Sequence, residues 1–370
     1  MSFQNIKFYI NEISGSFGDV GTFFPLLLIL SYVNGISLSS SFFFSGIFHI
    51  ISGLIFQIPI AIQPMKAIAA VAISSNLSNS IILWSGFFCG IFIILFHFFG
   101  ILKKIKENVK EPILYGIKFL LAFKLLNSSI DIIIKSEFFY PLNVLFIFSI
   151  LLVLLNLKFS IPSAILIFLI GSIFSFNNLH FSFPKFELSI LKFSFESLKL
   201  SLIQLPITVL NSIILVIAIA KNYFPEKEIN LKKLSFSIFF MNIFSFLFNA
   251  IPFCHGAGGL VSKYKFGARS HISNIFFGSS LIIICIFFGG SFDNFIKNYP
   301  IVFFTPLLFI TSFELMKGYK KLKSPNEIYL FLLSFFSMLI LNIFYGFLIS
   351  LIFEKIFISM KGLEDERKSA

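Results

Sequence analysis

The stretch IPIAIQPMK at residues 58–66 places two prolines, a glutamine and a lysine inside a run of otherwise apolar residues. Proline lacks a backbone N–H and disfavours helix in the residue before it, so a helix through this stretch must break. A second stretch, IPFCHGAGG at residues 251–259, repeats the Ile-Pro pair 193 residues later. Matching interruptions of this kind indicate two structural repeats, with a site where the breaks meet.

The composition around these stretches indicates that lipid is the solvent. Of the 370 residues, 57% are hydrophobic and 12% are charged, and the mean hydropathy is +0.94. A soluble domain carries about 25% charged residues, so there are too few here to cover a water-soluble core. The net charge of +12 lies in short clusters between apolar spans, which is typical of membrane-protein loops. We therefore expect no nucleic-acid partner.

Fourteen membrane spans are predicted, because a span needs about 20 apolar residues and fewer where the helix is broken. Whether the last two spans form one helix stays open. The spans are 14–33, 38–57, 60–75, 80–102, 111–134, 141–156, 159–176, 199–220, 234–251, 254–266, 271–290, 299–317, 327–341 and 343–357.

The distribution of lysine and arginine predicts the orientation. With the amino terminus inside, the inner segments hold 21 of these residues and the outer segments hold 5. Cytoplasmic loops carry this excess, so we expect a multi-pass protein of the cell membrane with both termini in the cytoplasm. The polar start, residues 1–11, predicts that no signal peptide is cleaved and that the first span is retained.

A second coincidence supports two repeats. The polar break at Gly18-Asp19 lies 192 residues before Asn211, close to the offset of the Ile-Pro pairs. We expect an all-α fold with a seven-span repeat at 1–180, an inverted seven-span repeat at 181–358 and a charged tail at 359–370. An odd number of spans in the first repeat forces the inversion of the second.

Ionisable groups within spans are expensive and are therefore candidates for the site. Asp19 and Thr22 lie in the glycine-rich run SGSFGDVGT, where the carboxylate either carries a coupling ion or pairs with a lysine. Gln63 and Lys66 flank Pro64, which is suited to the first turn of a helix. The amides and the positive end of such a helix, together with Lys66, predict an anion site.

The later break supplies the opposite wall. His255 can donate a hydrogen bond, and Gly256 and Gly258 allow the backbone to approach a ligand. Asn211, three residues after Thr208, offers an uncharged donor, although it could equally join helices. Arg269 is expected at the cytoplasmic mouth, where it either attracts anions or only marks the inner side.

Other chemistry is not indicated. Three cysteines, Cys89, Cys254 and Cys285, lie far apart in apolar stretches and suggest neither a disulfide nor a metal site. The sequence has no HExxH, no Walker loop and no GxSxG elbow. We therefore expect no metal, no cofactor and no enzyme, and a driving force that comes from an ion gradient or from the substrate itself.

Four segments together resemble the molybdate transporter family, a divergent relative of the SulP sulfate permeases. They are SFGDVGTFFP at 16–25, QPMKAIAAVAI at 63–73, PFCHGAGG at 252–259 and FGARS at 266–270. The resemblance implies uptake of molybdate, the inverted repeat of SulP and nucleobase permeases, and a ligand between the starts of spans three and ten. It extends over residues 11–280. SulP proteins usually carry a cytosolic regulatory domain, whereas about a dozen charged residues follow the last span here, so we expect no regulation through such a domain.

The expected mechanism is alternating access, in which a unit holding spans one, three, eight and ten moves against a second unit. Asp19 would be the counter-ion of Lys66 or the carrier of a coupling proton. Three alternatives stay open: a sulfate transporter, a nucleobase or small-solute permease of the same fold, and an anion channel. The oligomeric state also stays open, with a homodimer as one option.

Overall fold

The structure is a computed structural model in which residues 3–102, 111–135, 143, 146–152, 163–186, 188, 192–316, 322, 324–341 and 343–355 are described. These residues are mostly helical, with two strands of three residues each. A helical segment at 343–355 follows the last labelled helix. The elements are α1 Phe3–Ser16, α2 Val20–Asn34, α3 Leu38–Phe56, β1 Ile62–Pro64, α4 Lys66–Ser75, α5 Asn79–Phe98, α7 Glu111–Lys135, α9 Ser163–Ser175, η1 Phe176–Asn178, α10 Phe195–Ile207, η2 Thr208–Ile214, α11 Leu215–Tyr223, α12 Leu231–Leu247, β2 Phe253–His255, α13 Ala257–Lys265, α14 Ile272–Phe288, η3 Gly289–Ser291, α15 Phe292–Lys297, η4 Ile301–Phe303, α16 Phe304–Met316 and α17 Pro325–Leu341.

Local signals set several helix ends. The Ser37 hydroxyl accepts the Ser40 N–H at the start of α3, and the Asn230 side chain accepts the Lys233 N–H at the start of α12. Such caps satisfy amides that the helix itself cannot pair. Gly35 ends α2 in the left-handed conformation, with a φ of 69°, which glycine adopts without a steric cost.

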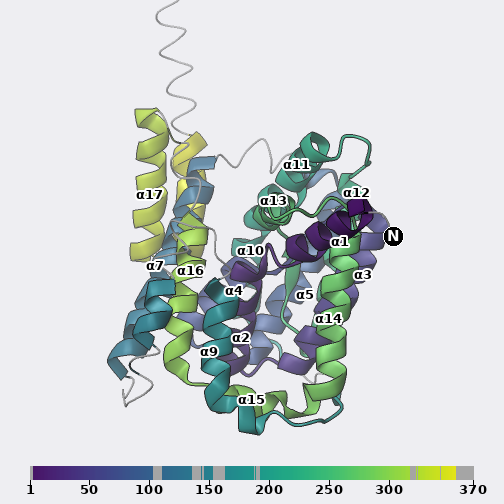
Figure 1. Cartoon of the computed structure of the whole chain (residues 1–370). Helices are drawn as coiled ribbons and strands as arrows, with labels where there is room; N and C mark the ends of the chain where they lie inside the picture. The colour runs from purple at the N-terminus through teal and green to yellow at the C-terminus, as the bar shows by residue number, and fades with distance from the viewer. Residues whose placement is uncertain are drawn as a thin grey trace, which may run out of the picture.

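The helices form two bundles with a connecting layer between them (Figure 1). In the larger bundle α3 packs against α14 and α5 packs against α12. In the smaller bundle α7 packs against α16 and α17. Helices α2 and α4 touch both, since α2 contacts α3 and α16 and α4 contacts α5 and α7.

Glycines bring α3 and α14 into close contact. A Cβ on Gly46 would lie 2.7 Å from the Gly278 carbonyl oxygen, and one on Gly278 would lie 2.5 Å from the Gly46 oxygen. Small residues at such crossings are a common means of helix packing in membranes.

Gly278→Ala is expected to destabilise the protein by about 1–3 kcal/mol, because the added methyl group overpacks this crossing. The melting temperature of the purified protein in detergent measures the effect. Gly21→Ala is the matched control, since no atom lies within 4 Å of its new Cβ. Equal melting of the two variants would contradict the packing role of Gly278.

The predicted breaks in spans one, three and ten are present in the structure. Span one is interrupted between α1 and α2, and spans three and ten begin as the extended strands β1 and β2 before they become helical. Span eight runs through α10, a π-helical turn η2 and α11. The breaks in spans three and ten confirm the prediction from the Ile-Pro stretches.

The packing of the spans follows the exchange expected of two repeats. A shift of seven spans pairs α3 with α12 and α5 with α14. The contact between α3 and α14 in one arrangement should therefore have a counterpart between α12 and α5, and both contacts exist. By the same shift, the contact between α2 and α4 has its counterpart between α11 and α13. The contact between α4 and α10 has its counterpart between α13 and α1, and all four contacts are present. This pattern supports repeats at 1–180 and 181–358, a division that stays a prediction.

The end of the chain contains two helices and not one. The Ser337 hydroxyl bonds to the Gly346 carbonyl, and a Cβ on Gly346 would lie 2.4 Å from the Met338 backbone. Residues eight or nine positions apart in one helix would be about 12 Å apart, so the chain must reverse between them. Half of the predicted span 141–156, the start of span 159–176 and the tail 359–370 lie outside the described residues.

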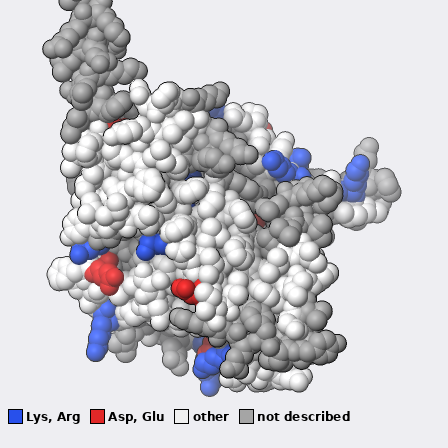
Figure 2. Space-filling view, turned by 90° about the vertical axis from the view of Figure 1, so that its left-hand side faces the viewer, with Lys and Arg blue, Asp and Glu red and all other residues white. Residues whose placement is uncertain are grey.

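The surface of the helices fits a lipid environment. Five described helical stretches are long and apolar enough to cross a membrane: Ile6–Asn34, Leu38–Phe56, Asn79–Phe98, Phe195–Tyr223 and Ile272–Lys297. Large apolar side chains such as Ile340, Ile134 and Phe195 are 77%, 75% and 74% exposed. Figure 2 shows charged side chains only sparsely on the described part of the face it presents. The protein is a multi-pass membrane protein.

Candidate functional site

The two strands join the broken spans in the middle of the connecting layer. β1 and β2 are antiparallel, with Gln63 opposite Cys254 and Ile62 opposite His255. The Met65 N–H donates to the Pro252 carbonyl oxygen at 2.9 Å. Each strand leads directly into a helix, β1 into α4 and β2 into α13. Because the ladder is only three residues long, about 10 Å, the amino ends of α4 and α13 lie close to each other.

Asp19 joins span one to this ladder. Its Oδ1 accepts hydrogen bonds from the Thr22 hydroxyl at 2.8 Å and from the Gln63 amide at 2.5 Å. The Gln63 nitrogen also lies 3.0 Å from the Thr22 hydroxyl oxygen. A Cβ on Gly259 would lie 2.5 Å from the Asp19 Oδ2 atom, so α13 is packed directly on the carboxylate. The structure thus brings together Asp19, Thr22 and Gln63.

The glycines at the start of α13 have different surroundings. A Cβ on Gly256 would lie 2.2 Å from Gln63, so only glycine leaves room for that amide. Gly258 is exposed, and no atom lies within 4 Å of a Cβ built on it. A Cβ built on Gly21, in the first turn of α2, also has no atom within 4 Å. The helix starts therefore adjoin open space.

Lys66 is the first residue of α4 and is half-buried. Its ammonium lies within electrostatic range of the Asp19 carboxylate. Among the described residues it has no hydrogen bond or ion pair. An unpaired ammonium at a helix start, where the helix dipole adds positive potential, is an arrangement that attracts anions.

Gln204, which was not predicted, contacts the same helix start. Its Oε1 accepts hydrogen bonds from the Ala67 and Ile68 backbone amides, at 2.9 and 3.3 Å. Its Nε2 donates to the Thr208 hydroxyl at 2.9 Å. The spacing of Gln204 and Thr208, four residues on one helix, was a signal available in the sequence.

The π-helix η2 changes which later residues share that face. It spans Thr208–Ile214, and a π-helix has a wider turn than an α-helix. Ser212 is only 1% exposed and follows Thr208 on the buried side, whereas Asn211 is half-buried. No described residue forms a hydrogen bond with the Asn211 side chain. Its predicted contact with a ligand stays a prediction.

His255 points away from Lys66 and Gln63. Directly opposite residues in a ladder share a face and successive residues alternate, so Gln63 and Cys254 face one side and His255 the other. The two ring nitrogens of His255 lie 3.3 Å from the Ala61 carbonyl oxygen and 2.9 Å from the Ser237 hydroxyl. The structure does not bring His255 together with the other predicted residues.

His255→Ala is expected to lower the melting temperature, at a cost of about 2 kcal/mol, because the Ser237 hydroxyl and the Ala61 carbonyl lose a hydrogen bond and a buried ring is removed. The KM for the transported anion should stay within about twofold of wild type, since a lost ligand contact would change it by more. Melting and uptake kinetics of the same preparation measure both. A large rise in KM at unchanged stability would make His255 a ligand contact.

Lys263 is a buried cation that sequence reasoning passed over. It is 0% exposed, and its ammonium donates to the Asn274 Oδ1 at 2.8 Å and lies 5.7 Å from the centre of the Phe277 ring. It is also within electrostatic range of Asp19. In the sequence it was one of several basic residues near the inner end of a span, which is why it was read as a topology signal. Asp19 therefore lies within the field of two lysines, Lys66 and Lys263.

Arg269 lies at the far end of α13. Its guanidinium donates to the carbonyl oxygens of Tyr264 and Ala268 and stacks 3.7 Å from the centre of the Tyr264 ring. Its backbone amide donates to Glu12 at 2.8 Å, which ties the end of α13 to α1. Arg269 is exposed, so it is away from the buried residues around Asp19. Its attraction for anions stays a prediction.

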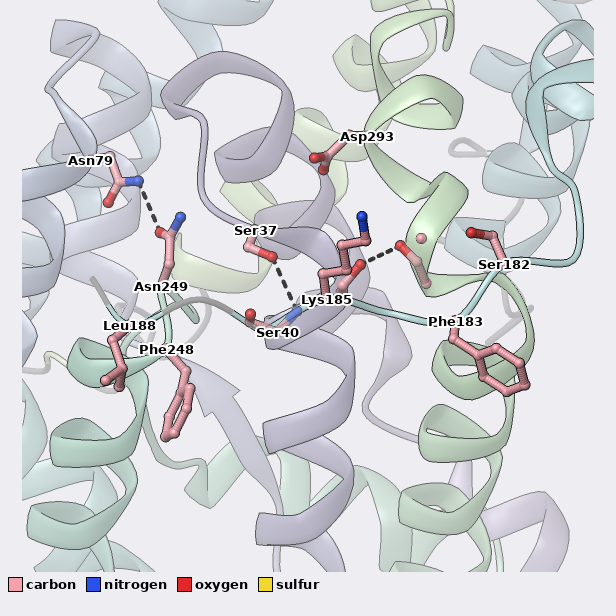
Figure 3. Close-up of a pocket in the computed structure, with 13 residues that line it drawn as sticks. Ser37, Ser40, Asn79, Ser182, Phe183, Lys185, Leu188, Phe248, Asn249 and Asp293 are labelled. Carbon is pink, nitrogen blue, oxygen red and sulfur yellow. Dashed lines mark hydrogen bonds between the residues drawn. The ribbon is translucent and has the colours of Figure 1, made fainter. Parts of the chain in front are cut away.

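A cavity of about 600 Å³ lies elsewhere, where α2 ends and α3 and α5 begin (Figure 3). Asn79 and Asn249, which are hydrogen bonded at 2.8 Å, and Lys185 and Asp293 line it. The 15 residues of α2 separate it from Asp19, a length of about 22 Å. None of the predicted site residues lines this cavity.

Comparisons with known proteins agree with the family resemblance. A family model described as a molybdate transporter of the MFS superfamily matches residues 11–125 and 196–315. Molybdate transporter 2 of Arabidopsis thaliana is 30% identical over 378 residues, which cover 87% of this chain and 81% of the relative. Molybdate transporter 1 of the same plant is 27% identical over 379 residues, covering 87% and 82%.

Solved structures identify the fold. The transmembrane domain of the cyanobacterium bicarbonate transporter BicA matches with a TM-score of 0.66 and 14% identity, covering 95% of this chain and 98% of that one. SLC26A9 matches with a TM-score of 0.68 and 11% identity, covering 96% and 66%. Since the family model covers more than half of the sequence, the chain belongs to the molybdate transporter family and has the SulP-type fold of BicA and SLC26A9.

Proposed function

We propose that the protein takes up molybdate, a tetrahedral dianion, by secondary active transport. The observation that carries this proposal is the unpaired Lys66 ammonium at the start of α4, beside the start of α13 and the open space at Gly258. An anion held there would meet a positive charge and the amino ends of two helices. The names of the two plant relatives supply the substrate.

Binding would use groups from three spans. Lys66 would give the main charge, the Gly256–Gly258 turn would give backbone amides, and Asn211 would give an uncharged donor, while Gln63 would hold the Asp19 carboxylate. Asp19, which holds Gln63, would be screened from the dianion by its own hydrogen bonds and by Lys263. Such a site binds a doubly charged oxyanion better than a neutral solute, because its donors converge on negative charge.

Access would alternate between the two sides through motion of the connecting layer against the smaller bundle, α7, α16 and α17. The excess of lysine and arginine in alternate segments supports cytoplasmic termini and insertion in the cell membrane. Asp19 contributes a carboxylate to this group of residues, and a carboxylate can take up and release a proton. It is therefore the candidate carrier of a coupled proton.

Uptake of labelled molybdate into proteoliposomes tests the proposal. Uptake is expected to saturate, to exceed that of empty liposomes and to be inhibited competitively by tungstate. Sulfate, added as a competitor, distinguishes a molybdate transporter from a sulfate transporter of the same fold. Flux that rises linearly with concentration would indicate a channel, and no flux of any of these anions would overturn the proposal.

A further inference from the structure

The start of α4 is closed by a side chain from a distant part of the sequence. Met65 at the N-cap position offers no side-chain cap, and Lys66 cannot accept a hydrogen bond. The Ala67 and Ile68 amides instead donate to the Oε1 atom of Gln204, 137 and 136 residues away. Gln204 is 0% exposed. The capping is therefore built into the fold and is not a contact of a surface side chain.

The Gln204 oxygen takes the position that an oxyanion oxygen would need. An anion at a helix start accepts hydrogen bonds from the first free backbone amides. In the structure these two amides are already paired with an amide oxygen, which is a neutral acceptor. Hydrogen bonds to an ionised acceptor are roughly twice as strong as those to a neutral one, so a dianion can compete for the same amides. The positive charge of Lys66 is not cancelled by the neutral cap.

A second buried hydrogen-bonding group, the Ser212 hydroxyl, lies beside the cap. The Ser212 hydroxyl is 1% exposed, lies on the buried face that Gln204 and Thr208 share, and has the Cys254 thiol as a hydrogen-bonding neighbour. A hydroxyl can both donate and accept, so Ser212 can receive the Gln204 amide when that side chain turns.

We propose that Gln204 is a displaceable cap, which occupies the anion position at the start of α4 and gives it up when the oxyanion binds. This inference rests on the proposed function. When the cap leaves, the Ala67 and Ile68 amides bind an anion oxygen, and the Gln204 side chain turns toward Thr208 and Ser212. When the cap returns, it competes with the anion and speeds its release. Gln204 is thus a positioning and specificity residue that favours anions with enough charge to displace it.

Two substitutions of Gln204 separate a displaceable cap from a merely structural one. Gln204→Ala removes the competitor, so the molybdate Kd is expected to fall about tenfold, although the unliganded protein melts at a lower temperature. Gln204→Glu keeps the cap and adds negative charge at a positive helix end. Its unliganded melting temperature is expected to equal or exceed that of wild type, and its molybdate Kd to rise at least about tenfold.

The measurements are melting of the purified protein without ligand and with increasing molybdate, together with the uptake KM. Gln57→Ala is the matched control, because the Gln57 amide binds only the Leu54 carbonyl at the exposed end of α3. Weaker or unchanged molybdate binding by Gln204→Ala would overturn displacement, as would wild-type affinity in Gln204→Glu. If the wild-type protein binds no molybdate, the proposed function fails, and unliganded melting of the two variants still decides whether Gln204 caps α4.

Discussion

Lys66→Ala is expected to reduce molybdate uptake by about a hundredfold at subsaturating concentration. Removing one charged member of a buried ionic contact costs about 2–5 kcal/mol, and about 2.7 kcal/mol corresponds to a hundredfold. The Lys66 ammonium forms no hydrogen bond with a described residue. Its substitution therefore leaves no other side chain without a partner. The loss should therefore appear in anion binding and not in folding.

The measurement is initial uptake of labelled molybdate into proteoliposomes, with the melting temperature of each preparation. Lys66→Arg keeps the charge and is expected to retain part of the activity. Lys221→Ala removes an exposed lysine in the last turn of α11 and controls for net charge. Uptake by Lys66→Ala at the rate of Lys221→Ala would show that the ammonium does not hold the anion.

Asp19→Asn and Lys263→Met are each expected to destabilise the protein strongly, and the double variant much less. Lys263 is fully buried, and Asp19 is 8% exposed, within its electrostatic range. Breaking a buried charge pair costs up to about 3–5 kcal/mol, and less here because Lys66 still acts on Asp19 and Glu12 still acts on Lys263, whereas replacing both charges is often neutral. The melting temperatures of the three variants and wild type form a double-mutant cycle. Additive losses would show that the two charges act independently.

The double variant also tests whether Asp19 carries a proton. If it does, an inward proton gradient should stimulate uptake by the wild-type protein, and Asp19→Asn/Lys263→Met should lose the stimulation. If Asp19 is only a counter-ion, the response to the gradient should be the same in both. Flux that does not depend on pH in either protein would remove the proton-linked role.

The broken spans could be predicted because proline and glycine act locally. Pro59, Pro64 and Pro252 each disfavour a regular helix, so the interruptions and the helix starts at Lys66 and Ala257 could be predicted from the sequence. Proline alone does not decide the outcome, since Pro25 and Pro206 lie inside α2 and α10. The grouping of Asp19, Thr22 and Gln63 was also within reach, since each is a polar residue at a break.

The orientation of individual side chains could not be predicted in the same way. Whether Gln63 or His255 faces the anion depends on the register of a three-residue ladder, and a shift of one residue reverses it. The position of Ser212 depends on a π-helix that has no clear sequence signal. The burial of Lys263 depends on Asn274, on the neighbouring helix, which no local pattern reveals.

The short ladder between β1 and β2 limits how the protein can move. Pulling the two strands apart would leave backbone groups unpaired in a medium with no water to replace the lost bonds, at several kcal/mol for each group. The two helix starts must therefore travel as one rigid piece, with the anion between them. Sliding is left to the surfaces where α4 meets α7 and α2 meets α16. A disulfide that fastens β1 to β2 should leave turnover intact, whereas one that fastens α4 to α7 should stop it.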